Sequence, residues 1–148
     1  MSDHLVKIIP KDPFCKVSNA ALQSAKSFLE KQIRCDSVEI EFNETPIFVD
    51  CGSNLEHISC PNCGEMLDFG WWGEAMDKAA ESEFTLMEVE MPCCRNIISL
   101  NDLNYYFPCG FACCLIQIYN PEQNIEDEII DVIQNILGSC VCIVEAHI

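Results

Sequence analysis

Basic side chains are scarce in this sequence. Lysine and arginine together number 8 against 24 aspartates and glutamates, and the formal net charge is −16 over 148 residues. Nucleic-acid phosphates and anionic membrane surfaces are both bound by clustered cations. The composition therefore argues against a nucleic-acid-binding protein and against one that docks on an acidic membrane. A partner, if it is charged, is expected to be a basic protein surface.

Long apolar segments and familiar catalytic motifs are also missing. No run approaches the ~18 residues that a membrane helix requires, and the longest, residues 111–118, is interrupted by Gln117. Residues 1–10 lack the apolar core and cleavage pattern of a secretory signal, so we expect a cytoplasmic protein with reduced cysteines. No glycine-rich phosphate loop, serine elbow or His-Glu-x-x-His motif is present, and no enzyme class is indicated.

Cysteine, in contrast, is abundant, with twelve residues in the chain. In a reducing compartment, clustered cysteines indicate metal binding before disulfides. The clearest motif is Cys60-Pro61-Asn62-Cys63-Gly64, in which two thiols can turn toward one ion and Gly64 permits the positive φ of a tight turn. Pro92-Cys93-Cys94 supplies a second pair. Four thiolates at about 2.3 Å would close a tetrahedral Zn²⁺ site.

The second pair departs from the usual Cys-x-x-Cys spacing, because Cys93 and Cys94 are adjacent. Neighbouring side chains of an extended strand point to opposite faces, so both can bind one ion only if the chain turns there. If it does not turn, Cys51 or His57 is the replacement ligand. A closed site of this kind stabilises structure and activates no water. Zinc is favoured over iron because a redox iron site would require two matched turns, and the sequence shows one.

Other cysteines carry weaker patterns. Cys109, Cys113 and Cys114 resemble part of an iron–sulfur motif, but the last two begin an apolar strand, which favours burial in the core. Cys140 and Cys142 share one face of the last strand, and a core position is favoured for them too. A thioredoxin-like redox role for Cys60 and Cys63 is disfavoured, since no helix begins directly at that motif.

The expected fold class is α/β (α+β). Apolar spacing predicts strands over residues 5–9, 38–42, 111–119 and 140–148, and helices over 19–34 and 121–137, the second with Asn120 as its cap. Two such strand–helix–strand units in one sheet form a ferredoxin-like two-layer sandwich, with an unrelated α+β arrangement as the alternative. Within a single domain of residues 1–148, residues 51–97 form a zinc-ribbon-like insert containing a helix over 71–82 and a strand over 84–91.

A recognition surface is expected near the second cysteine pair. Its candidate residues are aromatic or suited to turns: Trp71, Trp72, Asn101, Asp102, Tyr105 and Tyr106. The alternative, which we favour for the tryptophans, is that they pack the insert against the sheet. Helices cover one sheet face, so the other needs the insert or a second subunit, and a homodimer is one arrangement that provides it.

The Cys-Pro-Asn-Cys-Gly segment resembles the metal-binding turns of zinc ribbons and rubredoxins. Together with Pro-Cys-Cys and the Ser-Leu-Asn-Asp-Leu…Pro-Cys-Gly-Phe…Tyr-Asn-Pro run, it is similar to small uncharacterised bacterial proteins with a zinc-ribbon-like insert, over roughly the C-terminal two-thirds. The resemblance implies no catalytic residue. We therefore predict a structural zinc site in a non-catalytic protein-interaction or regulatory module. The alternatives are an acidic inhibitor or immunity-type protein that binds a basic partner, and a cysteine-based redox or metal-handling protein.

Overall fold

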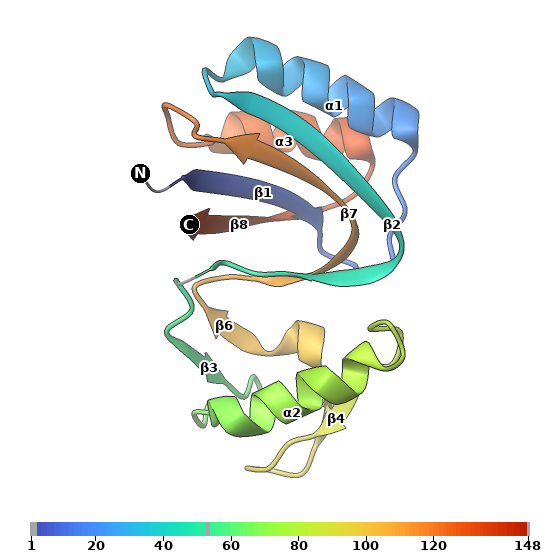
Figure 1. Ribbon diagram of the computed structural model, residues 1–148, viewed down its shortest axis with the longest axis vertical. Helices are drawn as coiled ribbons and strands as arrows, with labels where there is room; N and C mark the ends of the chain where they lie inside the picture. Colours follow the sequence, from blue (N-terminus) through green and yellow to red (C-terminus); the bar gives the residue numbers. More distant parts are fainter. Residues whose placement is uncertain (1–2, 53, 148) are drawn as a thin grey trace.

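The computed structural model describes residues 3–52 and 54–147, and this part of the chain is mixed α/β. Its main sheet has four strands in the order β2-β7-β1-β8, and every neighbouring pair is antiparallel. The strands are β1 (His4–Pro10), β2 (Ser37–Val49), β7 (Gly110–Tyr119) and β8 (Val141–His147). Figure 1 shows helices α1 (Asn19–Gln32) and α3 (Asp127–Leu137) together over one face of this sheet.

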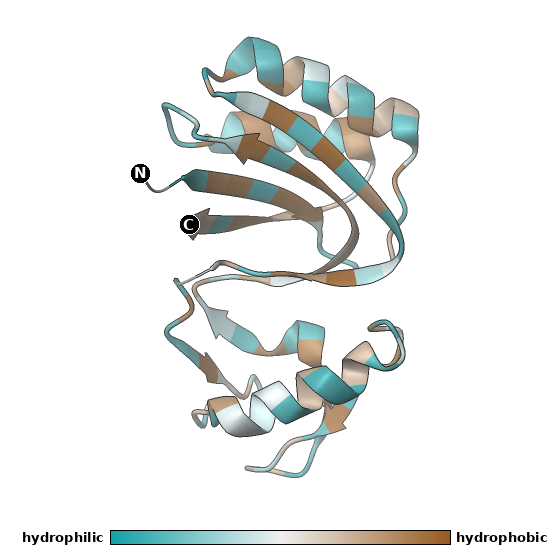
Figure 2. Ribbon diagram, viewed as in Figure 1, coloured by the Kyte–Doolittle hydropathy of each residue, from teal (hydrophilic) through white to brown (hydrophobic). Residues whose placement is uncertain are grey.

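The main core lies between the two helices and the sheet. It contains Leu29 from α1 and Ile133 from α3, packed against strand residues such as Ile8 and Ile116, all essentially inaccessible to solvent. Each fully buried side chain of this size contributes about 1.5–3 kcal/mol relative to exposure. Figure 2 shows apolar residues concentrated along β1, β7 and β8, and many hydrophilic residues on α1.

The last helix begins later than its sequence predicts. Asn120 does not cap a helix but has a positive φ of 50°, and its side chain ties the loop to distant segments. Its Oδ1 accepts from the His4 amide, and its Nδ2 donates to the carboxylates of Asp3 and Asp36. These long-range hydrogen bonds hold the residue in the loop, so α3 starts at Asp127 and the predicted start at Asn120 is wrong.

Strand β2 is a single long strand that runs on through Pro46. Its pairing with β7 is interrupted by a register shift between Phe42 and Ile47 and then continues to Val49, which lies opposite Gly110. Past the shift, β2 and β7 bend away from the helices together (Figure 1). The chain between them, residues 50–109, therefore leaves and rejoins the sheet at facing positions.

Residues 50–109 fold against this bent end of the β2–β7 pair (Figure 1). They include two small two-stranded sheets, one of β3 with β6 and one of β4 with β5. The elements are β3 (His57–Ser59), α2 (Phe69–Ala80), β4 (Glu88–Glu90), β5 (Ile97–Ser99), a 3-10 helix η1 (Leu100–Asp102) and β6 (Asn104–Tyr106). Strand β6, which lies beyond residue 97, pairs with β3.

Helix α2 corresponds to the predicted helix over 71–82 but begins and ends two residues earlier, with Asp68 as its N-cap. The predicted strand over 84–91 is shorter than expected, because Glu83 and Phe84 adopt positive φ values of 55° and 58° and form a turn. A second core joins this unit to the sheet, and its largest fully buried side chains are Ile58, Met91, Leu100 and Phe111. Across the part of the chain that is described, no helix is both long and apolar enough to cross a membrane.

Candidate metal centre

Four cysteines from two distant segments meet at the end of the molecule far from α1 and α3. The Sγ atoms of Cys60, Cys63, Cys93 and Cys94 all lie within 4.8 Å of one another. The Sγ–Sγ distance is 3.8 Å between Cys60 and Cys94 and 3.3 Å between Cys63 and Cys93. Thiolates bound tetrahedrally at about 2.3 Å to one ion lie about 3.8 Å apart. The cluster therefore has the dimensions to hold one metal ion.

The first pair is held by a tight turn that follows β3. The Cys60 amide donates to the Glu65 carbonyl at 2.9 Å, and the Gly64 amide donates back to the Cys60 carbonyl at 2.8 Å. Gly64 has a φ of 79°, a conformation that glycine adopts without the steric cost of a side chain. No atom lies within 4 Å of the position that a Cβ would occupy at Gly64, so its requirement is conformational. The turn directs both thiols to one side.

The second pair is held by a turn with the same hydrogen-bond pattern. The Met91 amide donates to the Asn96 carbonyl at 2.9 Å, and the Arg95 amide donates to the Met91 carbonyl at 2.9 Å. Arg95 has a φ of 63° and so takes the place of Gly64. The turn at Cys93 and Cys94 satisfies the condition that both adjacent cysteines face one ion.

The two turns correspond residue by residue, which the sequence analysis missed. Cys-Pro-Asn-Cys-Gly at 60–64 matches Met-Pro-Cys-Cys-Arg at 91–95, with proline second and cysteine fourth in both. Buried Met91 replaces the first cysteine, and Cys93 stands where the first turn has Asn62. The shared proline and fourth cysteine were the available signal. The absence of a second matched turn is therefore no argument against iron.

Within the cluster, the pKa values of Cys60 and Cys93 are shifted in opposite directions. Backbone hydrogen bonds, chiefly from Cys63, lower the pKa of Cys60 to about 7. Burial and the neighbouring thiols raise the pKa of Cys93 to about 12. The Asn62 side-chain amide also points to the Cys94 sulfur, at 3.6 Å. Because a metal binds thiolates, metal binding must displace protons and must compete with them as the pH falls.

The replacement ligands considered from the sequence lie elsewhere. Cys51 is buried, and its thiol donates to the Phe107 carbonyl at 3.6 Å. The His57 ring stacks on Tyr106 with a centroid distance of 4.9 Å. Neither belongs to the group of four whose ligand atoms converge.

The remaining cysteines form no second metal-binding group within the described residues. Cys113 and Cys114 are buried in β7, as the apolar pattern predicts. Burial raises the pKa of Cys109 far above its usual range. Cys140 is exposed, so its predicted core position is wrong, because it lies in the turn before β8 rather than in the strand.

The candidate recognition residues divide into two sets. Trp72 and Tyr105 are half-buried against the second core, where the Trp72 indole donates to the Tyr105 hydroxyl at 3.2 Å and Trp72 packs edge-on against Phe48 of β2. Asn101 accepts a hydrogen bond from the Phe111 amide. Trp71 instead lines a surface groove, and Asp102 and Tyr106 are exposed.

Comparisons with protein-family models, with curated proteins and with solved structures find no match to this chain. The chemistry of the site is therefore argued from its geometry. A closed set of four sulfur atoms on two rigid turns can hold a metal ion.

Proposed function

We propose that the protein binds one Zn²⁺ through Cys60, Cys63, Cys93 and Cys94, and that the ion is structural. The observation that carries the proposal is the convergence of four thiols on two turns with matching hydrogen bonds. Four thiolate ligands complete a tetrahedral shell and leave no position for water or substrate. Such a shell suits zinc or iron, and zinc is proposed because a closed structural site requires no redox chemistry.

The ion would stabilise the part of the chain that has the least regular structure. Strands β3, β4, β5 and β6 have three residues each, and isolated two-stranded sheets are at best marginally stable in water. The two cysteine turns follow β3 and β4 directly, so an ion between them would join the two small sheets. In a unit of this size, the free energy of metal binding is largely free energy of folding.

At the level of the whole chain, we propose a non-catalytic interaction module. Its frame would be a ferredoxin-like sandwich of β1, α1, β2, β7, α3 and β8, which is supported by the antiparallel order β2-β7-β1-β8 and by both helices lying over one face. The zinc-ribbon-like unit would be inserted between β2 and β7, with its end near residue 109 rather than 97. A cytoplasmic location is proposed because thiolate ligands need reduced cysteines.

Metal analysis of natively purified protein tests the zinc proposal. We expect about one zinc per chain, and its loss in Cys63→Ser, because a hydroxyl is a poor substitute for a thiolate ligand. Cys63 is the exposed member of the cluster, so this substitution disturbs packing least. Cys140→Ser, at an exposed cysteine outside the cluster, is the matched control and should keep its zinc. Iron in place of zinc, or full zinc content in Cys63→Ser, would refute the proposal.

A further inference from the structure

We propose that the groove between α2 and β4 binds a cationic segment of a partner protein that carries a bulky apolar side chain. This groove, which we call the acidic groove, has a volume of about 680 Å³. It is lined by Trp71, Glu74, Ala75, Lys78, Ala79, Glu81, Ser82, Leu86, Glu88, Val89 and Glu90. The proposal concerns a different surface from the cysteine cluster and does not depend on which ion the cluster holds.

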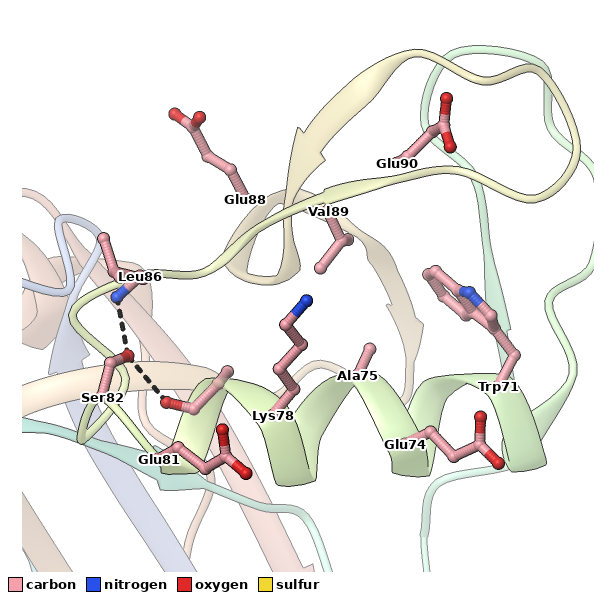
Figure 3. A pocket seen from close by; sticks show the side chains of 11 residues that line it. Trp71, Glu74, Ala75, Lys78, Glu81, Ser82, Leu86, Glu88, Val89 and Glu90 are labelled. Atoms are coloured by element: carbon pink, nitrogen blue, oxygen red, sulfur yellow. Dashed lines mark hydrogen bonds between the residues drawn. The ribbon is translucent and has the colours of Figure 1, made fainter.

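The floor of the acidic groove is apolar. Figure 3 shows Val89 of β4 pointing into the gap toward α2, where Ala75 lies and the Lys78 amine reaches up beside it, with the Trp71 indole at one end of the gap and Leu86 at the other. Leu86 is 76% exposed and adds to the apolar surface of the groove. An apolar floor with an exposed leucine at its end offers burial to an incoming aliphatic or aromatic side chain.

Both rims of the groove are negative. Glu74 lies on α2 and Glu81 directly follows its last residue, while Glu88 and Glu90 alternate with Val89 along β4 and point away from the helix (Figure 3). Within residues 3–52 and 54–147, none of these four glutamates takes part in an ion pair. Lys78 is the single cation in the lining, and its long side chain can move aside. The groove thus presents carboxylates that a partner's cations can neutralise.

A second groove extends this surface toward the main sheet. It has a volume of about 480 Å³, shares Leu86 and Glu88 with the first, and adds Phe14, Asp12 and Asp102 to its lining. Phe14 is 49% exposed and precedes α1, so the combined surface spans both parts of the molecule. An extended segment could place apolar side chains at Trp71, Leu86 and Phe14 while passing acidic residues on either side.

The charges that line the acidic groove favour one class of ligand over the others. An anionic ligand, or a second copy of this chain with its net charge of −16, would bring like charges together. A purely apolar segment would desolvate the rim carboxylates without pairing them. A lysine- or arginine-bearing segment pairs with the rims, can place a cation over the Trp71 ring, and is attracted by the field of the whole molecule.

Synthetic peptides binding to the metal-loaded, full-length protein test this inference. The probe is a short fluorescein-labelled peptide of alternating lysine and leucine, followed by fluorescence anisotropy. Two control peptides of equal length separate the contribution of charge from that of apolar contact. One has glutamate in place of lysine, and the other has serine in place of leucine. We expect the lysine–leucine peptide to bind and both others to bind at least about tenfold more weakly, since charge and apolar contact are both needed. Failure of the lysine–leucine peptide to bind would overturn the proposal.

Variants that remove negative or positive charges from the lining test whether the peptide binds in the acidic groove. Glu88→Gln combined with Glu90→Gln should weaken binding by about tenfold, whereas Lys78→Gln should strengthen it by about threefold, because each exposed charge pair contributes modestly. The control is Glu39→Gln with Glu41→Gln, two exposed glutamates at the same spacing on β2, which changes the net charge equally. Equal weakening by the control pair would show attraction by overall charge alone. Weaker binding of the lysine–leucine peptide by Lys78→Gln would show that Lys78 supports binding instead of opposing it, and either result refutes the proposal.

Discussion

Single residues decide how the two cysteine turns are made. Both turns need a positive φ at the fifth position, and the chain meets this need with Gly64 in one and Arg95 in the other. The sequence predicts the first turn because glycine after Cys-x-x-Cys is a recognisable signal. It does not predict the second, because an arginine gives no sign of a left-handed backbone, which costs a non-glycine residue roughly 1–2 kcal/mol.

Arg95→Gly should therefore stabilise the protein. Relief of the left-handed conformation is partly offset by the greater freedom of glycine in the unfolded chain, so we expect a gain of about 0.5–1 kcal/mol in the free energy of unfolding. Urea denaturation of the metal-loaded protein measures it. Arg95→Ala keeps the backbone cost and is the control. If alanine stabilises as much as glycine, the arginine side chain rather than φ is responsible.

Tyr105 joins η1 to α2 within residues 50–109 through its hydroxyl. That hydroxyl donates to the Leu100 carbonyl at 2.7 Å and accepts from the Trp72 indole at 3.2 Å. Burial raises the pKa of Tyr105 well above its usual range. The folded state thus keeps the phenol neutral at a pH where the unfolded chain already ionises it.

This predicts a loss of stability at alkaline pH. The contribution of Tyr105 is fully present below the unfolded pKa of about 10 and decreases as the pH rises from there toward the higher folded pKa. Tyr105→Phe should cost about 1–2 kcal/mol near neutral pH, because it leaves buried groups unpaired, and the cost should shrink as the pH rises beyond about 10. Urea unfolding across this range measures it, with exposed Tyr106→Phe as control. A cost that does not change with pH would contradict the assignment.

Whole elements could be predicted where their signal is local. Helix α1, with its Ser18 cap, and strand β7, with its apolar run, follow from periodicity and length. The three-residue strands β3 and β6 could not be predicted, because they exist only through pairing between segments far apart in the sequence. The start of α3 was predicted wrongly for the same reason, because long-range hydrogen bonds of Asn120 override its strong capping signal.

The difference between long and short strand pairings predicts that metal removal destabilises the small sheets more than the main sheet. The main sheet has longer ladders, whereas β3, β4, β5 and β6 depend on three-residue pairings close to the cysteine turns. With the ion removed by a chelator, backbone amides of the small sheets should exchange with solvent at least about tenfold faster, while those of β1, β7 and β8 keep their protection. Hydrogen–deuterium exchange with mass spectrometry resolves the two sets. Equal loss of protection in both would show that the ion supports the whole fold.

At the scale of the molecule, composition predicts the sign of a partner's charge but not where it binds. The excess of acidic residues is evident from the sequence, and it already argued for a basic protein rather than nucleic acid. The location of the acidic groove depends on how α2 packs beside β4 and on the turn that exposes Leu86. Of the residues predicted for recognition, Trp71, Asn101 and Asp102 line this combined surface, while Trp72 and Tyr105 are half-buried against the second core.

The facing positions of Val49 and Gly110 bear on the order in which the molecule assembles. Joining the ends of a long flexible segment costs entropy that rises with the logarithm of its length. Once β2 and β7 have paired, residues 50–109 form a closed loop. The pairing then limits how far apart the two cysteine turns can move. The sheet thereby raises the effective concentration of each thiol pair for the other. We therefore expect the proposed ion to bind more readily once β2 and β7 have paired.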